Sequence, residues 1–113
     1  MDKRIALSTP VTLHEGEAPI AAIDLREPTG ADLFDLGEPT QISRSPDGTY
    51  YEIEFVSVIR QYAGRLIKHE AGDHLLKLLS LEDGKRLKAA ILGFFTAADQ
   101  AIIKKSATSS SST

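Results

Sequence analysis

The positions of the prolines divide this chain into two parts. All five lie before residue 47, at positions 10, 19, 28, 39 and 46. Proline has no backbone N–H and clashes with the preceding turn of a helix, so it is confined to turns, strand edges and the first turn of helices. The sequence therefore predicts strands and turns in the front part and helices in the remainder. Together they would form a small α+β domain.

Two extended segments predict a β-hairpin over residues 5–26. Apolar and polar residues alternate in residues 5–13 and again in residues 19–26, which is the period of a half-buried strand. Residues 14–17, between them, hold a glycine among polar residues, as a hairpin turn does. Pro10 lies within the first segment, so we expect an edge strand or a break at that point.

The segment after the hairpin predicts a sharp corner from strand to helix. Pro28 ends the second strand, and Thr29 stands three residues before Asp32. This spacing is typical of a capping box, in which each side chain hydrogen-bonds the other residue's backbone N–H. Leu33 and further apolar residues follow, and Gly37 stands where a helix C-terminus favours glycine. A short helix is therefore expected from residue 29.

The middle of the chain leaves two interpretations open. Residues 38–48 include two prolines and an Asp-Gly pair, and they predict a loop. Thr49 and Glu52 repeat the capping-box spacing, and residues 50–68 lack proline, which predicts a helix. The β-branched cluster in residues 53–59 keeps a strand as the alternative for the first half. Gly72 then interrupts the helical pattern, and Asp73 is expected to cap a short leucine-rich turn.

A long last helix is predicted from a third capping box, Ser80 with Asp83. Apolar residues recur after it at helical spacing and should form one stripe facing the core. The stripe consists of Leu87, Ala90, Ile91, Phe94, Ala98, Ala101 and Ile102. The domain would span residues 1–105, with the helical part over 29–105. Residues 106–113 are rich in serine and threonine, which predicts a disordered tail.

Composition excludes several classes of protein. The chain has 113 residues, a net charge of −3 and no cysteine, so disulfides, thiolate metal sites and cysteine nucleophiles are absent. Basic residues form no block interleaved with aromatic residues, which argues against nucleic-acid binding. No segment has the roughly 20 apolar residues needed to span a bilayer, nor the apolar run of a signal peptide. We expect a cytoplasmic protein without a membrane partner.

No constellation of side chains predicts catalysis. The densest potential metal cluster is His69-Glu70 with Asp73-His74, but its histidines are five residues apart rather than the four that place two ligands on one helical face. The serines have no nucleophile-elbow context, and no glycine-rich loop for phosphate is present. We therefore expect no enzymatic activity, no cofactor and no metal site.

The strand-to-helix corner resembles a known family. Its residues Arg26, Pro28, Thr29, Gly30, Asp32 and Leu33 match a Leu-Arg-x-Pro-Thr-(Ala/Gly)-x-Asp-Leu element. The chain thereby resembles the phage tail assembly chaperones of contractile-tailed temperate and Mu-like phages. Residues 5–13 resemble the opening strand of that family, and residues 78–95 resemble its closing helix with paired aromatics. Together the matching blocks cover about half of the chain.

The resemblance implies a function in virion assembly. Such a chaperone, often encoded in a prophage, binds the long, helical, aggregation-prone tape measure protein in the host cell cytoplasm and keeps it soluble during tail assembly. The alternative is a structural tail component or oligomeric adaptor that remains in the particle. Genes of the family lie between the tail tube and tape measure genes.

The residues themselves suggest where a partner would bind. Leu92 and Ile103 project about a third of a turn or more from the apolar stripe, either as partner contacts or as ordinary exposed apolar side chains. We expect Leu92, Phe95 and Ile103 to contact the partner, and the edge of the N-terminal hairpin to mediate self-association. The corner residues Arg26, Pro28, Thr29, Asp32 and Leu33 are expected to be architectural, because capping and strand termination account for them.

Overall fold

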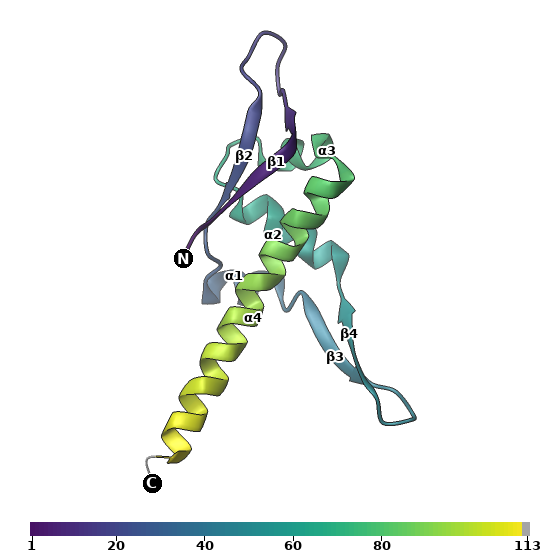
Figure 1. Cartoon of the computed structure of the whole chain (residues 1–113), viewed down its shortest axis with the longest axis vertical. Helices are drawn as coiled ribbons and strands as arrows, with labels where there is room; N and C mark the ends of the chain where they lie inside the picture. The colour runs from purple at the N-terminus through teal and green to yellow at the C-terminus, as the bar shows by residue number, and fades with distance from the viewer. Residues whose placement is uncertain (112–113) are drawn as a thin grey trace.

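The computed structural model describes the backbone of residues 1–111 and the side chains of residues 1–106. The part of the chain that it describes is α+β, as predicted, with two separate two-stranded antiparallel sheets and four helices. Figure 1 shows a small body from which two elements project. The elements in order are β1 (Lys3–Val11), β2 (Ile20–Leu25), α1 (Gly30–Leu36), β3 (Thr40–Arg44), β4 (Tyr50–Glu54), α2 (Val56–Leu66), α3 (Gly72–Leu78) and α4 (Leu81–Ser111).

The predicted N-terminal hairpin is confirmed. β1 and β2 pair antiparallel, with Lys3 opposite Leu25 and Ala6 opposite Ala22. The turn is closed by the Glu17 N–H, which donates to the His14 carbonyl at 3.1 Å. The register shifts between Ala6 and Val11, where Pro10 interrupts the ladder as expected.

A second hairpin replaces the loop and the start of the helix predicted for the middle of the chain. β3 and β4 pair with Thr40 opposite Glu54 and Arg44 opposite Tyr50. The helix predicted from residue 50 is therefore wrong over its first six residues, and α2 begins only at Val56. The strand alternative for the first half of residues 50–68 is confirmed over β4, although the strand ends at Glu54, before most of the β-branched cluster. The segment 29–105 is accordingly not entirely helical.

The turn of this second hairpin explains why Thr49 does not cap a helix. The Thr49 N–H donates to the Asp47 carboxylate at 2.9 Å, and the Ser45 N–H donates to the Thr49 carbonyl at 2.8 Å. Gly48 has a φ of +90°, which favours glycine at this position. The Ser45 and Thr49 contacts hold the pKa of Asp47 at about 2. Thr49 thus belongs to a turn that leads into β4.

The body of the protein consists of the first hairpin, α1, α2, α3 and the beginning of α4. The end of α2 lies against β2. Ile67 and Leu25 form an isolated antiparallel β-bridge there, and the Arg26 N–H donates to the Leu66 carbonyl at 2.9 Å. The predicted short leucine-bearing segment is confirmed as α3, but the helix begins at Gly72 itself with Ala71 at its N-cap and no side-chain cap, so the expected cap by Asp73 is wrong. The buried core is made of Leu7, Val11, Ile23, Leu25, Ile59, Tyr62, Ala63, Leu66, Ile67, Leu75, Leu87, Ile91 and Phe94.

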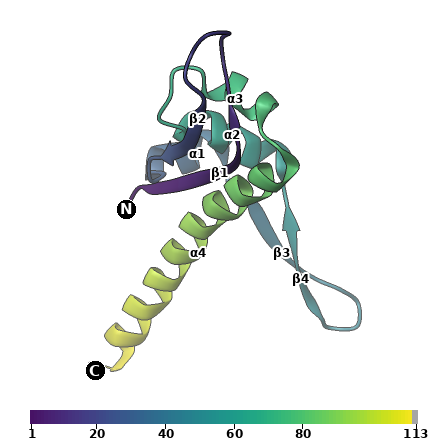
Figure 2. The same ribbon diagram turned by 45° about the horizontal axis from the view of Figure 1, so that its top comes forward.

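The predicted apolar stripe of α4 is only half buried. Leu87, Ile91 and Phe94 lie in the core, whereas every residue over 96–106 is exposed. The expectation that Ala98, Ala101 and Ile102 face the core is therefore wrong. α4 has 31 residues, or about 46 Å at 1.5 Å per residue, so the helix extends beyond the body. Both views show its second half standing away from the other elements (Figures 1 and 2).

We call residues 96–106 the helical arm, and β3, β4 and their turn the hairpin arm. The two arms diverge from the body (Figure 2), and the molecule measures 62 × 36 × 26 Å along its principal axes. α4 is helical to Ser111, beyond the predicted helix end at residue 105. The expected disordered tail, residues 106–113, falls largely outside the described side chains, with residues 112 and 113 outside the description altogether, and it stays a prediction.

Candidate interaction surface

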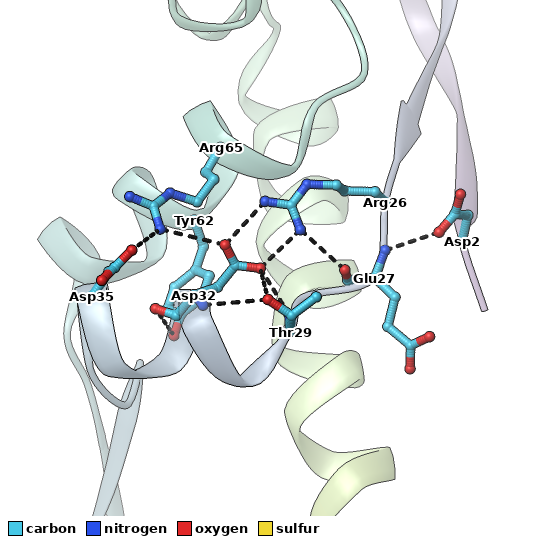
Figure 3. Close-up of polar contacts among 8 residues, drawn as sticks. All are labelled: Asp2, Arg26, Glu27, Thr29, Asp32, Asp35, Tyr62 and Arg65. Atoms are coloured by element: carbon cyan, nitrogen blue, oxygen red, sulfur yellow. Dashed lines mark hydrogen bonds and ion pairs between the residues drawn. The ribbon is translucent and has the colours of Figure 1, made fainter.

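The strand-to-helix corner is built around one buried carboxylate. Asp32 accepts from Arg26 through both of its oxygens, at 2.8 and 3.0 Å, and from the Thr29 N–H at 2.7 Å (Figure 3). The Asp32 N–H in turn donates to the Thr29 hydroxyl at 3.4 Å, so the predicted capping box is present. A two-pronged arginine contact of this kind fixes both partners in orientation.

The same carboxylate joins α1 to α2. Arg65 lies 2.8 Å from Asp35 and 3.4 Å from Asp32, and the Tyr62 hydroxyl donates to the Gly37 carbonyl at 2.7 Å. The Arg26 hydrogen bonds hold the pKa of Asp32 far below its ordinary value. Its bonding capacity is thus used within the fold, which supports the architectural role expected for this corner.

A second buried carboxylate fastens the beginning of α4 to β1. The Asp83 N–H donates to the Ser80 hydroxyl at 3.2 Å, as in the predicted cap. Its carboxylate, however, accepts from the backbone N–H groups of Ser8 at 2.8 Å and Thr9 at 3.1 Å, and from the Ser8 hydroxyl at 3.0 Å. These bonds lower the pKa of Asp83, with the Ser8 N–H as the largest cause. They satisfy the donors that the register shift in β1 releases.

The three predicted partner contacts occupy different environments. Leu92 and Phe95 are half-buried and pack against the core. The Phe95 ring meets Tyr62 edge to face, with ring centroids 5.0 Å apart. Ile103 lies on the helical arm and is 67% exposed. Leu92 and Phe95 therefore anchor the base of the arm, while Ile103 is available along it.

The helical arm presents apolar side chains on adjoining faces. Ile102 is 63% exposed, close to the value for Ile103. Consecutive residues of a helix point about 100° apart, so Ile102 continues the side that carries Phe94 and Ala98, whereas Ile103 lies nearer the side that carries Leu92. Sequence periodicity identified the stripe but missed the exposure of its second half.

A groove runs along one side of the base of the arm. It has a volume of about 240 Å³ and lies between the corner and α4. The side chains of Glu27, Glu38 and Asp99 line it together with an apolar group. The apolar lining consists of Pro28, Leu33, Phe94, Phe95, Ala98 and Ile102. Three of the corner residues, Pro28, Thr29 and Leu33, thus form part of a surface, which their local pattern did not indicate.

The hairpin arm also exposes apolar side chains, with Ile42 and Tyr50 on one face and Tyr51 on the other. Ile42, Tyr50 and Tyr51 are 62%, 66% and 50% exposed. The Arg44 guanidinium lies over the Tyr50 ring, 5.7 Å from its centroid. At the base of this arm, Lys88 of α4 pairs with Glu54 at 2.8 Å. The pair joins the end of β4 to the buried part of α4.

The edges of the N-terminal hairpin are partly occupied within the chain. The Lys68 N–H donates to the Asp24 carbonyl at 2.8 Å on the β2 side. On the β1 side, the Arg86 guanidinium donates to the Ala6 carbonyl at 3.3 Å. These contacts leave less of the edge for the expected self-association, and the hairpin arm and helical arm offer more exposed surface.

The histidine cluster has a structural explanation. The His69 Nδ1 atom accepts from the Ala71 N–H at 3.0 Å, in the turn between α2 and α3. Within the described residues, no three histidine or acidic side chains gather closely enough to hold a metal ion. Arg60 and Arg65 share a polar hollow with Glu70 and Asp73 there, so charges of both signs meet in it.

No family model, curated protein or solved structure matches this chain. Over the residues described, none of the helices combines the length and the apolar content needed to cross a membrane.

Proposed function

We propose that the chain is a phage tail assembly chaperone that binds the tape measure protein in the host cell cytoplasm and keeps it soluble. The proposal starts from the resemblance of the corner residues to that family. The observation that carries it is the helical arm, which leaves Ile102 and Ile103 exposed on a helix that stands away from the body. An unpaired apolar helical surface is suited to cover the apolar stripe of another helix.

The partner helix would lie along the side of the arm that carries Ile103. Leu92 is half-buried at the base of the arm and lies within about 20° of Ile103 around the helix axis, so it would extend this contact toward the body. Phe95 lines the groove on the neighbouring side and would meet the partner only at the edge of the contact. The remainder of the arm supplies polar side chains such as Thr96 and Asp99, which are exposed. A contact of this kind shields apolar residues and still permits release when the tail tube assembles.

The test is co-expression with the tape measure protein encoded in the same tail gene cluster. We expect the tape measure protein to move from the insoluble to the soluble fraction and to co-purify with the chain. Ile103→Glu should weaken co-purification at least about tenfold, because it places a charge at a buried apolar contact. Leu81→Glu is the control, since Leu81 is 78% exposed at the other end of α4. No gain in solubility and no co-purification would refute the proposal.

The hairpin arm favours the alternative, a structural component or oligomeric adaptor retained in the particle. Its exposed Ile42 and Tyr50, which share one face of the hairpin by register, would pack permanently against another tail protein. Mass spectrometry of purified particles distinguishes the two functions. The chaperone should be missing from finished virions, whereas an adaptor should be present in a fixed ratio to the tail proteins.

A further inference from the structure

The groove at the base of the helical arm and the end of that arm have complementary chemistry. The groove has an apolar lining and carries the acidic residues Glu38 and Asp99, while Glu27, which also lines it, pairs with the N-terminal ammonium. The arm ends in the sequence Ile102-Ile103-Lys104-Lys105, so its apolar residues are followed directly by two positive charges. An occupant suited to the groove needs this combination of an apolar segment and nearby cations.

We propose that the groove binds the helical arm of a second copy of this chain, so that two copies form an antiparallel dimer about a two-fold axis. Each copy carries one groove and one arm, and the arm itself forms one wall of the groove. Such a surface is self-complementary and closes after two copies, as two-fold interfaces do. The dimer would also bury the half of the α4 stripe that the body leaves exposed.

Helix geometry gives the register of this pair. Ala98 is central among the α4 residues that line the groove, which extend from Phe94 to Ile102, so the two Ala98 side chains would meet near the axis. Ile102 of the second copy then lies opposite Phe94 and Phe95, one turn away from the axis. Lys105 follows by nearly one more turn and would approach the carboxylate of Glu38.

This inference does not depend on the proposed function, because the dimer forms from the chain alone. The groove contains Ile102, whereas Ile103 points about 100° away from it. Substitutions at these two neighbouring residues therefore test separate surfaces. They have the same side chain and nearly the same exposure, 63% and 67%.

The first measurement is the oligomeric state of the purified chain, by sedimentation equilibrium or light scattering. We expect a dimer, at least a tenfold weaker dimer for Ile102→Glu, and an unchanged dimer for Ile103→Glu. A chain that is monomeric up to about 1 mM, or a dimer that Ile102→Glu leaves intact, would overturn the proposal. If Ile102→Glu instead abolishes binding to the tape measure protein while the unmodified chain is monomeric, the groove belongs to that partner.

Exchanging the charges tests the pairing directly. Glu38→Lys and Lys105→Glu should each weaken the dimer severalfold, and the double variant should recover most of the loss, since opposite charges face each other again. Two losses that simply add in the double variant would contradict the predicted register.

A cysteine cross-link tests the axis without requiring the dimer to be weakened. The chain has no cysteine, so Ala98→Cys introduces a single thiol, which should form an intermolecular disulfide rapidly under mild oxidation. Ala97→Cys is the control, because Ala97 is an exposed alanine on the same arm but points away from the groove. Equal cross-linking rates for the two variants would overturn the proposed axis.

Discussion

At the scale of single residues, two buried carboxylates hold the fold together. Asp32 ties β2, α1 and α2 through Arg26, Thr29 and Arg65. Asp83 ties α4 to the irregular part of β1. The sequence indicated the cap at Asp32, because its partner Thr29 is three residues away. It could not indicate the bonds from Asp83 to Ser8 and Thr9, since some 75 residues separate the partners and only the tertiary fold brings them together.

Replacing Asp32 with asparagine should destabilise the protein by about 2 kcal/mol. The change keeps the size of the side chain but removes the negative charge that Arg26 pairs with. Breaking a charge pair at a buried carboxylate lowers the free energy of unfolding. The free energy of unfolding in urea measures the effect. Asp35→Asn is the control, because Asp35 is 61% exposed, and its loss should cost no more than about 0.5 kcal/mol. Equal effects of the two substitutions would show that the corner does not depend on Asp32.

The lowered pKa of Asp32 predicts a specific dependence of stability on pH. Its ordinary value is 3.8, and Arg26 holds the folded-state value well below that. The carboxylate therefore stabilises the fold fully above about pH 5, and this contribution is lost as the pH falls below 4 toward the folded-state pKa. The stability gap between the native chain and Asp32→Asn should be constant from pH 5 to 7 and shrink at lower pH. A gap that widens on acidification would contradict this assignment.

At the scale of elements, local patterns predicted the structure where the determinants are local. The first hairpin, the corner and the start of α4 follow from alternation, Pro28 and capping residues. The second hairpin was missed because Thr49 and Glu52 mimic a helix cap, whereas Asp47 and Gly48 actually form a hairpin turn. The apolar periodicity of α4 correctly predicted the face that packs on the core up to Phe94. It did not predict that the same face is exposed from residue 96 on, because periodicity holds no information on how far the rest of the fold extends along the helix.

The link between β1 and α4 should be visible in hydrogen exchange. Asp83→Ala removes the acceptor for the Ser8 and Thr9 N–H groups, so these two amides should exchange faster. Amides of β3 and β4 should keep their rates, because these two strands form a sheet of their own and do not pair with β1 or β2. Unchanged exchange at Ser8 and Thr9 would mean that this link does not protect β1 in solution.

At the scale of the whole molecule, a small body carries two projecting arms. The thirteen residues of the hydrophobic core come from the first hairpin, α2, the segment that follows it, α3 and the first half of α4, and none comes from β3 or β4. The body thus holds the hydrophobic core, while the two arms carry exposed apolar side chains. This division suits a protein that presents long apolar surfaces to partners while its fold stays intact.

The division predicts that the hairpin arm can be removed without loss of the fold. Replacing residues 42–52 with two glycines should leave the helical circular dichroism signal in place and shift the melting temperature by no more than about 4 °C. The body keeps all of its core residues in this variant. An unfolded product would show instead that the hairpin arm is part of the cooperative unit.

Binding of the tape measure protein by the helical arm, as proposed, would change the surroundings of the backbone amides along that arm. The most direct measurement is an amide NMR titration of the ¹⁵N-labelled chain with a soluble fragment of the tape measure protein. We predict saturable shifts for amides over residues 92–106, and no such shifts in the Ile103→Glu variant. Amide shifts confined to other elements, or none at saturating fragment, would contradict the account.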